Sequence, residues 1–258
     1  MKNYNPRDYW EKCLSKRFEL SGVGHAGFSE YYNKWLYKAK IRTLKKALLS
    51  QQIDIHDKIV CDVGCGTGFF IDFYRLQGAQ DIVGVDITSI SIRNLKLKYS
   101  EYHFIKEDVS SSSLVSKINR KFDILNVFDI LYHIKENKAF RRAIANISNL
   151  TKNKGVIFIS DLCGSKSIDV AEHVEFRSRK IYEITLEENG IEIIAIYSLY
   201  YLLNRPIFGM IKLVGLREIG ISLDNLFAPI YYCLDGIFLS SKSNKNNLNL
   251  IVAKKVKP

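Results

Sequence analysis

The chain has 258 residues, of which 47% are hydrophobic and 25% are charged. This composition is typical of a globular protein, and it excludes disorder, collagen-like repeats and coiled coil as descriptions of the whole chain. The length predicts one large domain or two small ones, with ample material for a buried core.

The formal net charge is +11, and its position along the chain limits what it can mean. Residues 1–58 hold 12 basic and 6 acidic side chains, and residues 240–258 hold 5 basic side chains and no acidic one. Residues 59–239 therefore balance at 21 basic against 21 acidic side chains. The neutral centre argues against a groove that follows nucleic-acid phosphates, while the basic ends favour an acidic small molecule at the mouth of a cleft.

The chain begins with a region of helical pattern. Residues 4–50 have aromatic and aliphatic side chains interleaved with Lys and Arg, and glycines at 22, 24 and 27 interrupt the pattern. This predicts a short helix, a loop and a longer helix from about Ser29. We expect residues 1–50 to form an N-terminal helical extension that can act as a lid, and residues 51–258 to form the main domain.

From Lys58 onward, short β-branched runs alternate with amphipathic stretches, which predicts parallel strands joined by crossover helices. Strands are expected at 59–63, 82–86, 102–106, 122–127, 155–160, 191–199 and 248–254. Helices are expected at 68–77, 89–98, 112–118, 139–150 and 177–189. Residues 204–247 interrupt this alternation, and we expect a helical insertion there that shapes a substrate site or closes over it.

Cysteine usage and hydropathy indicate the compartment. The five cysteines are scattered, with no CxxC pair and no zinc spacing, which favours reduced thiols and no metal site. The first residues lack the apolar segment of a signal peptide, and no apolar run reaches the 18 residues or so that span a bilayer. The sequence therefore predicts a cytoplasmic protein without membrane insertion.

One glycine-rich segment points to a ligand. Residues 60–70 read Val-Cys-Asp-Val-Gly-Cys-Gly-Thr-Gly-Phe-Phe and are expected to close a strand and open a helix, where glycines let a ligand approach the peptide units. A dinucleotide-binding loop would have glycine at position 69, but Phe69 stands there. Asp86 ends the next strand, where a carboxylate can accept hydrogen bonds from both hydroxyls of a ribose. Asp108 follows the third strand, where it can accept from an adenine amine or cap the Ser-rich turn.

In this order, these motifs resemble the class I S-adenosylmethionine-dependent methyltransferases. The resemblance covers roughly residues 55–200 and the last strand, and it rests on Asp62–Gly68, Asp86, Asp108, Phe122–Asp129 and Gly155–Asp161. Residues 9–50 and 172–205 also resemble a bacterial subgroup that acts on small molecules. The resemblance implies a Rossmann-like α/β fold with helices on both faces of a seven-stranded mixed sheet. The strand order would be 3-2-1-4-5-7-6, with strand 7 antiparallel.

The resemblance also implies S-adenosylmethionine as cofactor, lying across the carboxyl ends of strands one and two. Asp62 would orient the glycine loop, and Asp86 would take the ribose. The residues that would pack against the homocysteine portion are Gly64, Cys65, Gly66 and Gly68. The adenine would lie beside Ile87 and Val109, with Asp108 on its amine, and the Phe128 carbonyl would face the methionine amine.

Methyl transfer to a hydroxyl also needs a base within hydrogen-bond reach. Three candidates follow strands at the carboxyl edge of the predicted sheet: His133, Asp161 and His173. His173 has the most favourable setting, because Glu172, Glu175 and Arg177 surround it in the sequence. His133 could instead order the cofactor loop, and Asp161 could cap the turn after strand five.

Aromatic and polar side chains near both ends of the chain are candidates for the rest of the site. Tyr32 and Trp35 lie at helical spacing, so core packing is the simplest interpretation, but they could close over the sulfonium. The candidates for the acceptor pocket are His173, Arg177, Tyr201, Asn204 and Arg205.

The sequence thus predicts a methyltransferase that acts on a small molecule, most simply on a hydroxyl of a sugar or secondary metabolite. A phosphorylated or nucleotide-linked acceptor is the form of it that the basic ends of the chain suggest. An RNA or protein methyltransferase is one alternative, although the Asn/Asp-Pro-Pro-aromatic motif of nucleobase-amine enzymes is replaced by Asn126-Val127-Phe128-Asp129. A non-catalytic cofactor-binding scaffold is the other. A metal-assisted variant is disfavoured, because Leu162 follows Asp161 where a third ligand would stand. The oligomeric state is left open.

Overall fold

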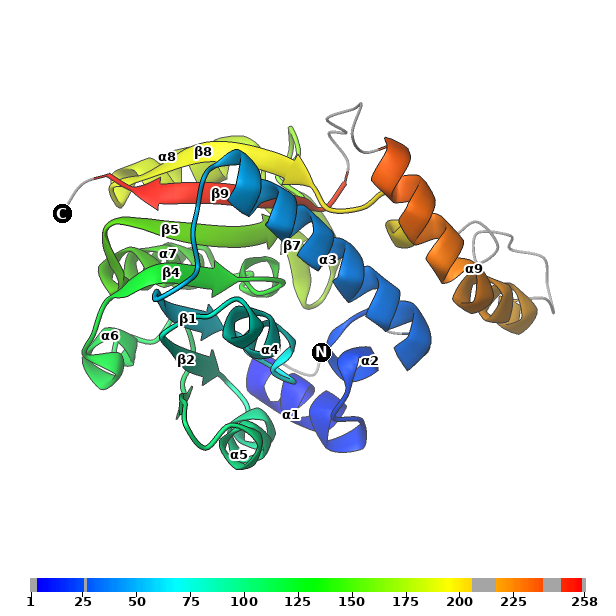
Figure 1. Cartoon of the computed structure of the whole chain (residues 1–258), viewed down its shortest axis with the longest axis horizontal. Coiled ribbons are helices and arrows are strands. Elements are labelled where there is room, and N and C mark those ends of the chain that lie inside the picture. The colour runs from blue at the N-terminus through cyan, green and yellow to red at the C-terminus, as the bar shows by residue number, and fades with distance from the viewer. Residues whose placement is uncertain (1–3, 26, 206–216, 239–246, 257–258) are drawn as a thin grey trace.

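The computed structural model describes residues 4–25, 27–205, 217–238 and 247–256 (Figure 1). Its centre is a seven-stranded sheet in the order β3-β2-β1-β4-β5-β9-β8. The strands are β1 (Ile59–Val63), β2 (Asp81–Asp86), β3 (His103–Lys106), β4 (Phe122–Val127), β5 (Thr151–Asp161), β8 (Ile191–Ser198) and β9 (Asn249–Lys255). β9 pairs antiparallel with both β5 and β8, and the other neighbours pair in parallel. This confirms the predicted strand order, with β8 and β9 as the sixth and seventh strands.

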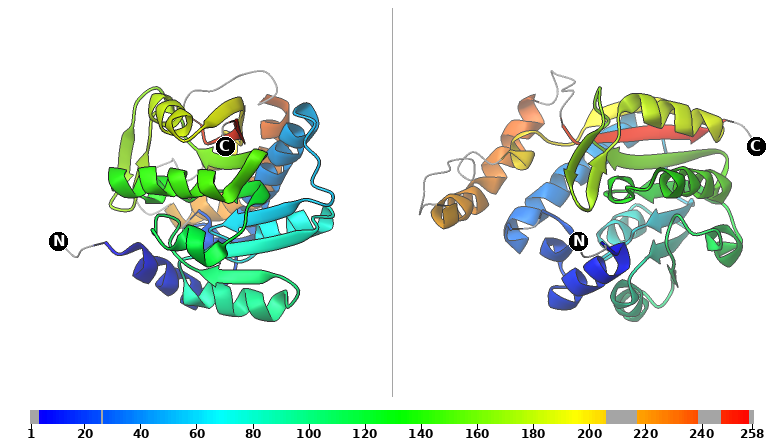
Figure 2. Two further views of the ribbon diagram at one scale, coloured as in Figure 1. Left: turned by 90° about the vertical axis from the view of Figure 1, so that its left-hand side faces the viewer. Right: turned by 180° about the vertical axis from the view of Figure 1, so that it is seen from behind.

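Helices cover both faces of the sheet (Figures 1 and 2). One face carries α3 (Glu30–Ser50), α4 (Phe69–Leu76) and α5 (Ser89–Lys98), and the other carries α6 (Leu114–Ile118), α7 (Asn137–Leu150) and α8 (Arg179–Glu188). Because both faces are covered, the central strands are buried on both sides, which explains why they read as continuous β-branched runs.

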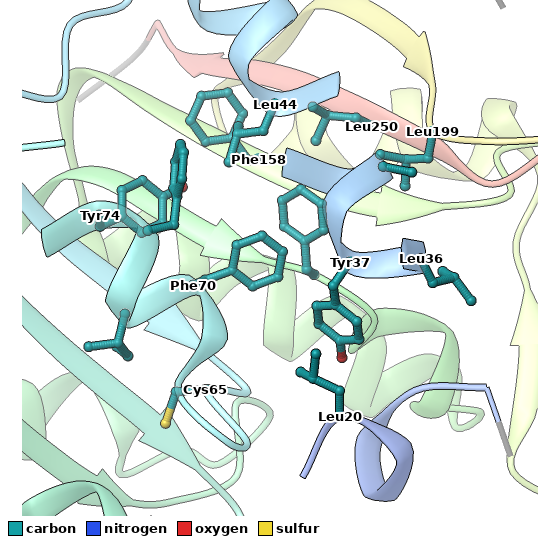
Figure 3. Packing of buried hydrophobic residues seen from close by; sticks show 14 of the residues in the cluster. Leu20, Leu36, Tyr37, Leu44, Cys65, Phe70, Tyr74, Phe158, Leu199 and Leu250 are labelled. Atoms are coloured by element: carbon teal, nitrogen blue, oxygen red, sulfur yellow. The ribbon is translucent and has the colours of Figure 1, made fainter. Parts of the chain in front are cut away.

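The core under α3 joins the N-terminal part of the chain to the sheet (Figure 3). Leu44 of α3 packs in the same cluster as Tyr74 of α4, Phe158 of β5 and Leu250 of β9. The buried side of α3 runs the length of the helix, from Tyr32 to Leu48. This helix therefore covers the β8–β9 end of the same face on which α4 and α5 lie.

Two short helices precede α3 and lie at the carboxyl edge of the sheet (Figure 1). These are α1 (Pro6–Lys16) and α2 (Leu20–Val23). The Asn5 side chain caps α1 by accepting from the backbone of Arg7 and Asp8. Glu11 ties α1 to the main body, because its carboxylate accepts from Ser89 N and Ile90 N at the start of α5, at 2.7 and 3.1 Å.

Two features were not predicted. A two-stranded hairpin of β6 (Ile168–Ala171) and β7 (Val174–Phe176) follows β5, and the residues after β4 form a single 3-10 turn, η1 (Leu131–His133). The hairpin strands are only three or four residues long and exposed or half-buried, so they lack a run of apolar residues.

The expected insertion is described in part. A second 3-10 turn, η2 (Leu202–Asn204), is followed after a gap by α9 (Arg217–Phe238), and residues 206–216 and 239–246 of the expected 204–247 insertion lie outside the described ranges. α9 continues through Pro229, although proline removes one backbone hydrogen bond inside a helix. Its buried side, with Ala228 and Tyr231, packs into the core and outweighs the one hydrogen bond lost at proline. No helix in the described part of the chain is both long and apolar enough to cross a bilayer.

Candidate functional site

A cleft of about 500 Å³ opens at the carboxyl edge of β1, β2 and β4. The strand ends and the loops after them contribute Gly64, Cys65, Gly66, Asp86, Ile87, Asp108, Val109 and Phe128. The N-terminal segment and helices contribute Tyr4, Pro6, Trp10, Leu14, Val23 and Tyr37. Other lining residues are Asp129, Ile130, His133, Lys135, Arg142 and Glu172. The structure therefore brings eight of the predicted cofactor residues and one predicted base to a single cleft.

The glycine loop at the floor of the cleft needs its glycines. Gly64, Gly66 and Gly68 have φ of +75°, +49° and +82°, in the left-handed region that side chains disfavour. A Cβ on Gly64 would lie 2.0 Å from Cδ1 of Ile130. Gly68 does not line the cleft but is the N-cap residue of α4. The loop thus keeps its backbone close to any ligand in the cleft.

Asp86 links the glycine loop to the end of β2. Its Oδ2 accepts from Gly66 N at 2.9 Å, and its Oδ1 accepts from Thr88 N at 2.8 Å and from the Thr88 hydroxyl at 2.6 Å. Burial raises the pKa of this carboxyl, and the hydrogen bonds from Thr88 and Gly66 oppose the rise. Each carboxylate oxygen has two acceptor sites, so Oδ2 can still take a ligand hydroxyl.

Asp108 begins the turn after β3. Its Oδ1 accepts from Ser110 N and from the Ser110 hydroxyl, both at 2.7 Å, which is the turn-capping role that the sequence also allowed. Asp108 nevertheless lines the cleft beside Val109. Because Oδ2 lies outside this turn, the carboxylate can cap the turn and accept from an adenine amine together.

Asp62 lies beneath the loop and is fully buried without lining the cleft. Its Oδ1 accepts from Asn126 Nδ2 at 2.7 Å, and the Tyr74 hydroxyl donates to Asn126 Oδ1 at 2.9 Å. Burial raises the pKa of Asp62 to about 7, and the hydrogen bond from Asn126 opposes the rise. Its Oδ2 has no hydrogen-bond partner, although buried acceptors are almost always paired.

These observations fit the cofactor that the sequence resemblance implied. The Tyr4 hydroxyl, whose residue lines the cleft, is a second buried polar atom without a partner. The glycine loop offers backbone at short range, and Asp86 and Asp108 stand 22 residues apart at the ends of adjacent strands. An unpaired hydroxyl, a glycine-rich loop and two carboxylates are what a ribose, an adenine amine and an amino-acid end require.

A buried ion pair that the sequence did not predict joins α3 to Asp129, which lines the cleft. Lys40 of α3 pairs with Oδ2 of Asp129, and the Ser160 hydroxyl donates to Asp129 Oδ1 at 2.7 Å. Burial alone would raise the pKa of Asp129, but the Lys40 ammonium and the Ser160 hydroxyl lower it below its ordinary value. Asp129 adopts a φ of +59°, which this network holds in place.

His133 presents one free ring nitrogen to the site. It lines the cleft, and its Nδ1 lies 2.9 Å from the backbone oxygen of His173. Because a carbonyl can only accept, Nδ1 must carry the proton, and Nε2 of the neutral ring is then an acceptor. Burial lowers the pKa of His133 to about 4, so the ring is neutral near pH 7. No other His of the described residues lines this cleft.

The two other candidate bases lie elsewhere. Asp161 is fully buried, accepts from the Tyr182 hydroxyl and from Leu162 N, both at 2.6 Å, and does not line the cleft. The His173 ring packs against Tyr9 with ring centres 4.9 Å apart and stacks on the His133 ring at 5.8 Å, but only its neighbour Glu172 lines the cleft.

The side chains expected to shape the acceptor pocket hold the fold together instead of lining the cleft. Arg177 is 1% exposed and donates to the Lys135 carbonyl at 2.9 Å and to Asn137 Oδ1 at 3.1 Å. Arg205 donates to Asn247 Oδ1 at 2.7 Å and stacks over the Tyr201 ring. Asn204 ends the η2 turn. None of Arg177, Tyr201, Asn204 and Arg205 is among the residues lining this cleft.

A different aromatic residue of α3 reaches the cleft. Tyr32 donates to the Leu203 carbonyl at 2.8 Å, and Trp35 packs on Tyr232 of α9 at 5.3 Å between ring centres. Tyr37, about half a turn around the helix from Tyr32, lines the cleft, and Lys40 Nζ lies 3.9 Å from its ring centre. Helical spacing identified the aromatic cluster but could not give the rotation of the helix about its axis.

Signals for some of the missed residues are visible in hindsight. Lys40 falls on the apolar side of α3, and a buried cation requires a partner. Tyr4, Trp10 and Tyr37 have no such local signal, because aromatic residues interleaved with Lys and Arg occur throughout that region. Among the described residues, no group of three His, Cys, Asp or Glu side chains could hold a metal ion.

Comparison with known proteins adds independent evidence. A family model described as a methyltransferase domain matches residues 32–196. The ubiquinone biosynthesis O-methyltransferase of Neisseria meningitidis serogroup C is 26% identical over 162 residues, which cover 57% of this chain and 65% of the relative. The mRNA cap guanine-N(7) methyltransferase of Schizosaccharomyces pombe is 27% identical over 140 residues, 49% of this chain and 36% of the relative. The chain thus covers less than two thirds of these relatives.

Solved structures share the fold at low sequence identity. Magnesium protoporphyrin IX methyltransferase from Synechocystis, crystallised with bound S-adenosylmethionine, has a TM-score of 0.58 and 15% identity, covering 96% of this chain and 94% of that one. The 1,6-didemethyltoxoflavin-N1-methyltransferase of Burkholderia thailandensis has a TM-score of 0.51 and 14% identity, covering 86% and 79%. At this identity the likeness concerns the fold.

Proposed function

The chain belongs to the class I S-adenosylmethionine-dependent methyltransferases, and from that premise we propose that it methylates a hydroxyl of a small-molecule acceptor. It is a methyltransferase whose cofactor is S-adenosylmethionine. The observation that carries the choice of a hydroxyl is His133, which lines the cleft and keeps Nε2 as the acceptor nitrogen of its neutral ring. A hydroxyl loses a proton on methylation, so a neutral imidazole at the site has a defined task.

The cofactor supplies a methyl group already activated by the positive sulfur. The protein then has to hold the reactants in line and exclude water. Trp10 and Leu14 of α1 and Tyr37 of α3 cover the cleft, which supports water exclusion. His133 Nε2 takes the hydroxyl proton, while the His173 carbonyl keeps Nδ1–H in place.

The charge of the cleft bears on the acceptor. Three Asp and three Glu side chains line it, against two basic residues. Asp129 and Glu107 are paired with Lys40 and Lys117, which leaves Asp86, Asp108, Glu136 and Glu172 without a lysine or arginine partner among the described residues. Lys135 is paired with Asp169, and Arg142 donates to the Ser110 carbonyl. Carboxylates favour the cationic cofactor but oppose a phosphorylated acceptor. We therefore propose an uncharged hydroxylated acceptor in place of the acidic one expected from the net charge.

The test is methyl transfer from labelled S-adenosylmethionine to a panel of uncharged phenols, sugars and polyols. His133→Ala should keep S-adenosylhomocysteine binding but lower kcat by about 10²–10⁴-fold, the usual contribution of a general base. His103→Ala, an exposed histidine on β3, is the matched control and should leave kcat unchanged. Equal kcat for His133→Ala and the wild type would remove His133 from the reaction.

The pH dependence gives a second check. With a pKa near 4, His133 is unprotonated from pH 5 to 8, so kcat should be flat there and fall only as pH drops toward 4. A kcat that falls by half near pH 6.5 would indicate an unburied histidine as the base.

RNA methylation is the second candidate function, favoured by the nucleic-acid-modifying relatives. These include the cap methyltransferase above and the tRNA U34 carboxymethyltransferase of Helicobacter pylori, which is 23% identical over 171 residues, 65% of this chain and 62% of the relative. Unmodified total RNA belongs in the same labelled-donor assay. Label transferred to RNA and to no small molecule would replace the first proposal with this one.

A further inference from the structure

The positive charge of the N-terminal region gathers on α3, away from the cleft. Lys34, Lys38 and Lys45 are exposed on one side of this helix, and Arg42 is half-buried beside them. None of the four forms an ion pair with a carboxylate in the described part of the chain. Arg42 Nη2 also has no hydrogen-bond partner. The three lysines are therefore uncompensated, while the Arg42 charge opposes the rise that burial causes in the pKa of Asp235.

The neighbouring helix α9 carries an exposed apolar stripe. Leu226, Ile230 and Ile237 are 68%, 50% and 65% exposed, and Leu223 is 36% exposed. They recur at helical spacing on the side opposite the buried Asp224, Ala228, Tyr231 and Asp235. Both acidic side chains of residues 221–237 are thus buried, so this exposed side carries no negative charge.

The two helices lie side by side and run in the same direction (Figure 1). Ser29 N donates to Asn225 Oδ1 at 3.2 Å, and further along Arg42 Nη1 donates to the Tyr232 carbonyl at 2.6 Å. α3 buries the side that faces the sheet, and α9 buries the side that faces η2. The exposed sides of the two helices therefore share an outer surface. We call this surface the α3–α9 face. Its members are Lys34, Lys38, Arg42 and Lys45 of α3, with Leu223, Leu226, Ile230 and Ile237 of α9.

A hollow on this face adjoins the cleft. It measures about 440 Å³ and is lined by Lys38, Ile41, Arg42, Lys45, Tyr232 and Phe69. Phe69 also lines the main cleft. Arg42 stacks over the Tyr232 ring, with 4.2 Å from Cζ to the ring centre, so a cation is held at the boundary between the basic and the apolar helix.

We propose that the α3–α9 face docks on the surface of a bilayer that contains anionic phospholipids. A phospholipid surface matches both halves of the face, because headgroup phosphates pair with unpaired cations and the acyl boundary takes exposed apolar side chains. A second copy of the chain would bring like charges together. An RNA would pair with the cations but leave the apolar stripe in water.

The test is co-sedimentation of the full chain with vesicles of phosphatidylcholine alone and of phosphatidylcholine with phosphatidylglycerol. We expect binding only to the anionic vesicles, weakened by salt. Replacement of Lys34, Lys38 and Lys45 by Glu should lower the vesicle affinity at least tenfold, and so should Leu226→Asp with Ile230→Asp. Binding of S-adenosylhomocysteine should be unchanged in these variants, which shows that they are folded.

Matched controls distinguish vesicle binding by the α3–α9 face from an effect of net charge or of exposed leucines elsewhere on the protein. Replacement of the exposed Lys96, Lys154 and Lys180 by Glu makes the same change in net charge, and Leu76→Asp with Leu97→Asp removes leucines that are 72% and 81% exposed elsewhere. Both controls should bind anionic vesicles like the wild type. Equal loss in the controls, no binding to anionic vesicles, or a dimer that Leu226→Asp dissociates would overturn the proposal. So would RNA binding that competes with the vesicles.

Discussion

The buried pair of Lys40 and Asp129 gives the sharpest test of how the N-terminal helix supports the cleft. The Lys40 side chain is 3% exposed and that of Asp129 is 16% exposed. Lys40→Met keeps the length of the side chain but leaves a carboxylate without its counter-ion. Removing one partner of a buried pair typically costs about 3–5 kcal/mol of the free energy of unfolding. That is a large fraction of the roughly 5–15 kcal/mol of a typical domain.

Two further variants show whether the loss comes from the pair. Lys98→Met breaks the Lys98–Asp72 pair, whose side chains are 51% and 36% exposed, and should cost about 0–1 kcal/mol. Lys40→Met with Asp129→Asn removes both charges, while the amide oxygen can still accept from Ser160. This double variant should recover most of the stability that Lys40→Met loses.

Urea unfolding followed by circular dichroism measures the differences in the free energy of unfolding between these variants and the wild type. The pH dependence of each difference shows whether the Asp129 carboxylate stabilises or destabilises the fold. In the wild type the folded pKa of Asp129 lies below its ordinary value of 3.8, so its contribution is present above that pH and lost as pH falls further. In Lys40→Met, burial without the cation raises the folded pKa, so its penalty shrinks as pH falls from 7 toward 4. A loss below 1 kcal/mol at pH 7, or no recovery in the double variant, would refute the reasoning.

Three more changes test the cleft itself. Gly64→Ala should weaken S-adenosylhomocysteine binding and should lower the stability of the fold more than Gly27→Ala does. Both glycines have positive φ, but only a Cβ at Gly64 would meet another side chain, at 2.0 Å from Ile130. Equal effects of the two variants in calorimetric titration and thermal unfolding would contradict this. Glu11→Ala removes the carboxylate that ties α1 to α5, so S-adenosylhomocysteine should dissociate several-fold faster in stopped flow, while Asp8→Ala on the exposed side of α1 should not change the rate. Asn126→Ala leaves the Tyr74 hydroxyl and Asp62 unpaired, which should cost about 1–3 kcal/mol in urea unfolding; a smaller loss would indicate that water replaces the amide.

The strand order and the floor of the cleft follow from local features of the sequence. β-branched runs identify strands buried on both faces, and the spacing between them requires crossover helices. Because parallel strands end at one edge, residues at successive strand ends must meet there, which brought Asp86 and Asp108 to the glycine loop. Glycine's tolerance of positive φ is a property of the residue itself, so the sequence alone could predict that Gly64 and Gly66 form a tight loop at the ligand site.

Other features of the cleft depend on how a helix is rotated about its axis and on contacts between residues far apart in the chain, so only the tertiary structure determines them. Whether Tyr32 or Tyr37 faces the cleft is set by how α3 rolls on the sheet, which helical spacing does not determine. The pairing of Lys40 with Asp129 joins residues 89 positions apart. The structure favours His133 over His173 as the base because of a hairpin that the sequence did not predict. The His173 backbone carbonyl in this hairpin accepts from His133 Nδ1, and every residue type carries such a carbonyl. A main-chain atom leaves no trace in the side-chain pattern, so only the fold could show where it points.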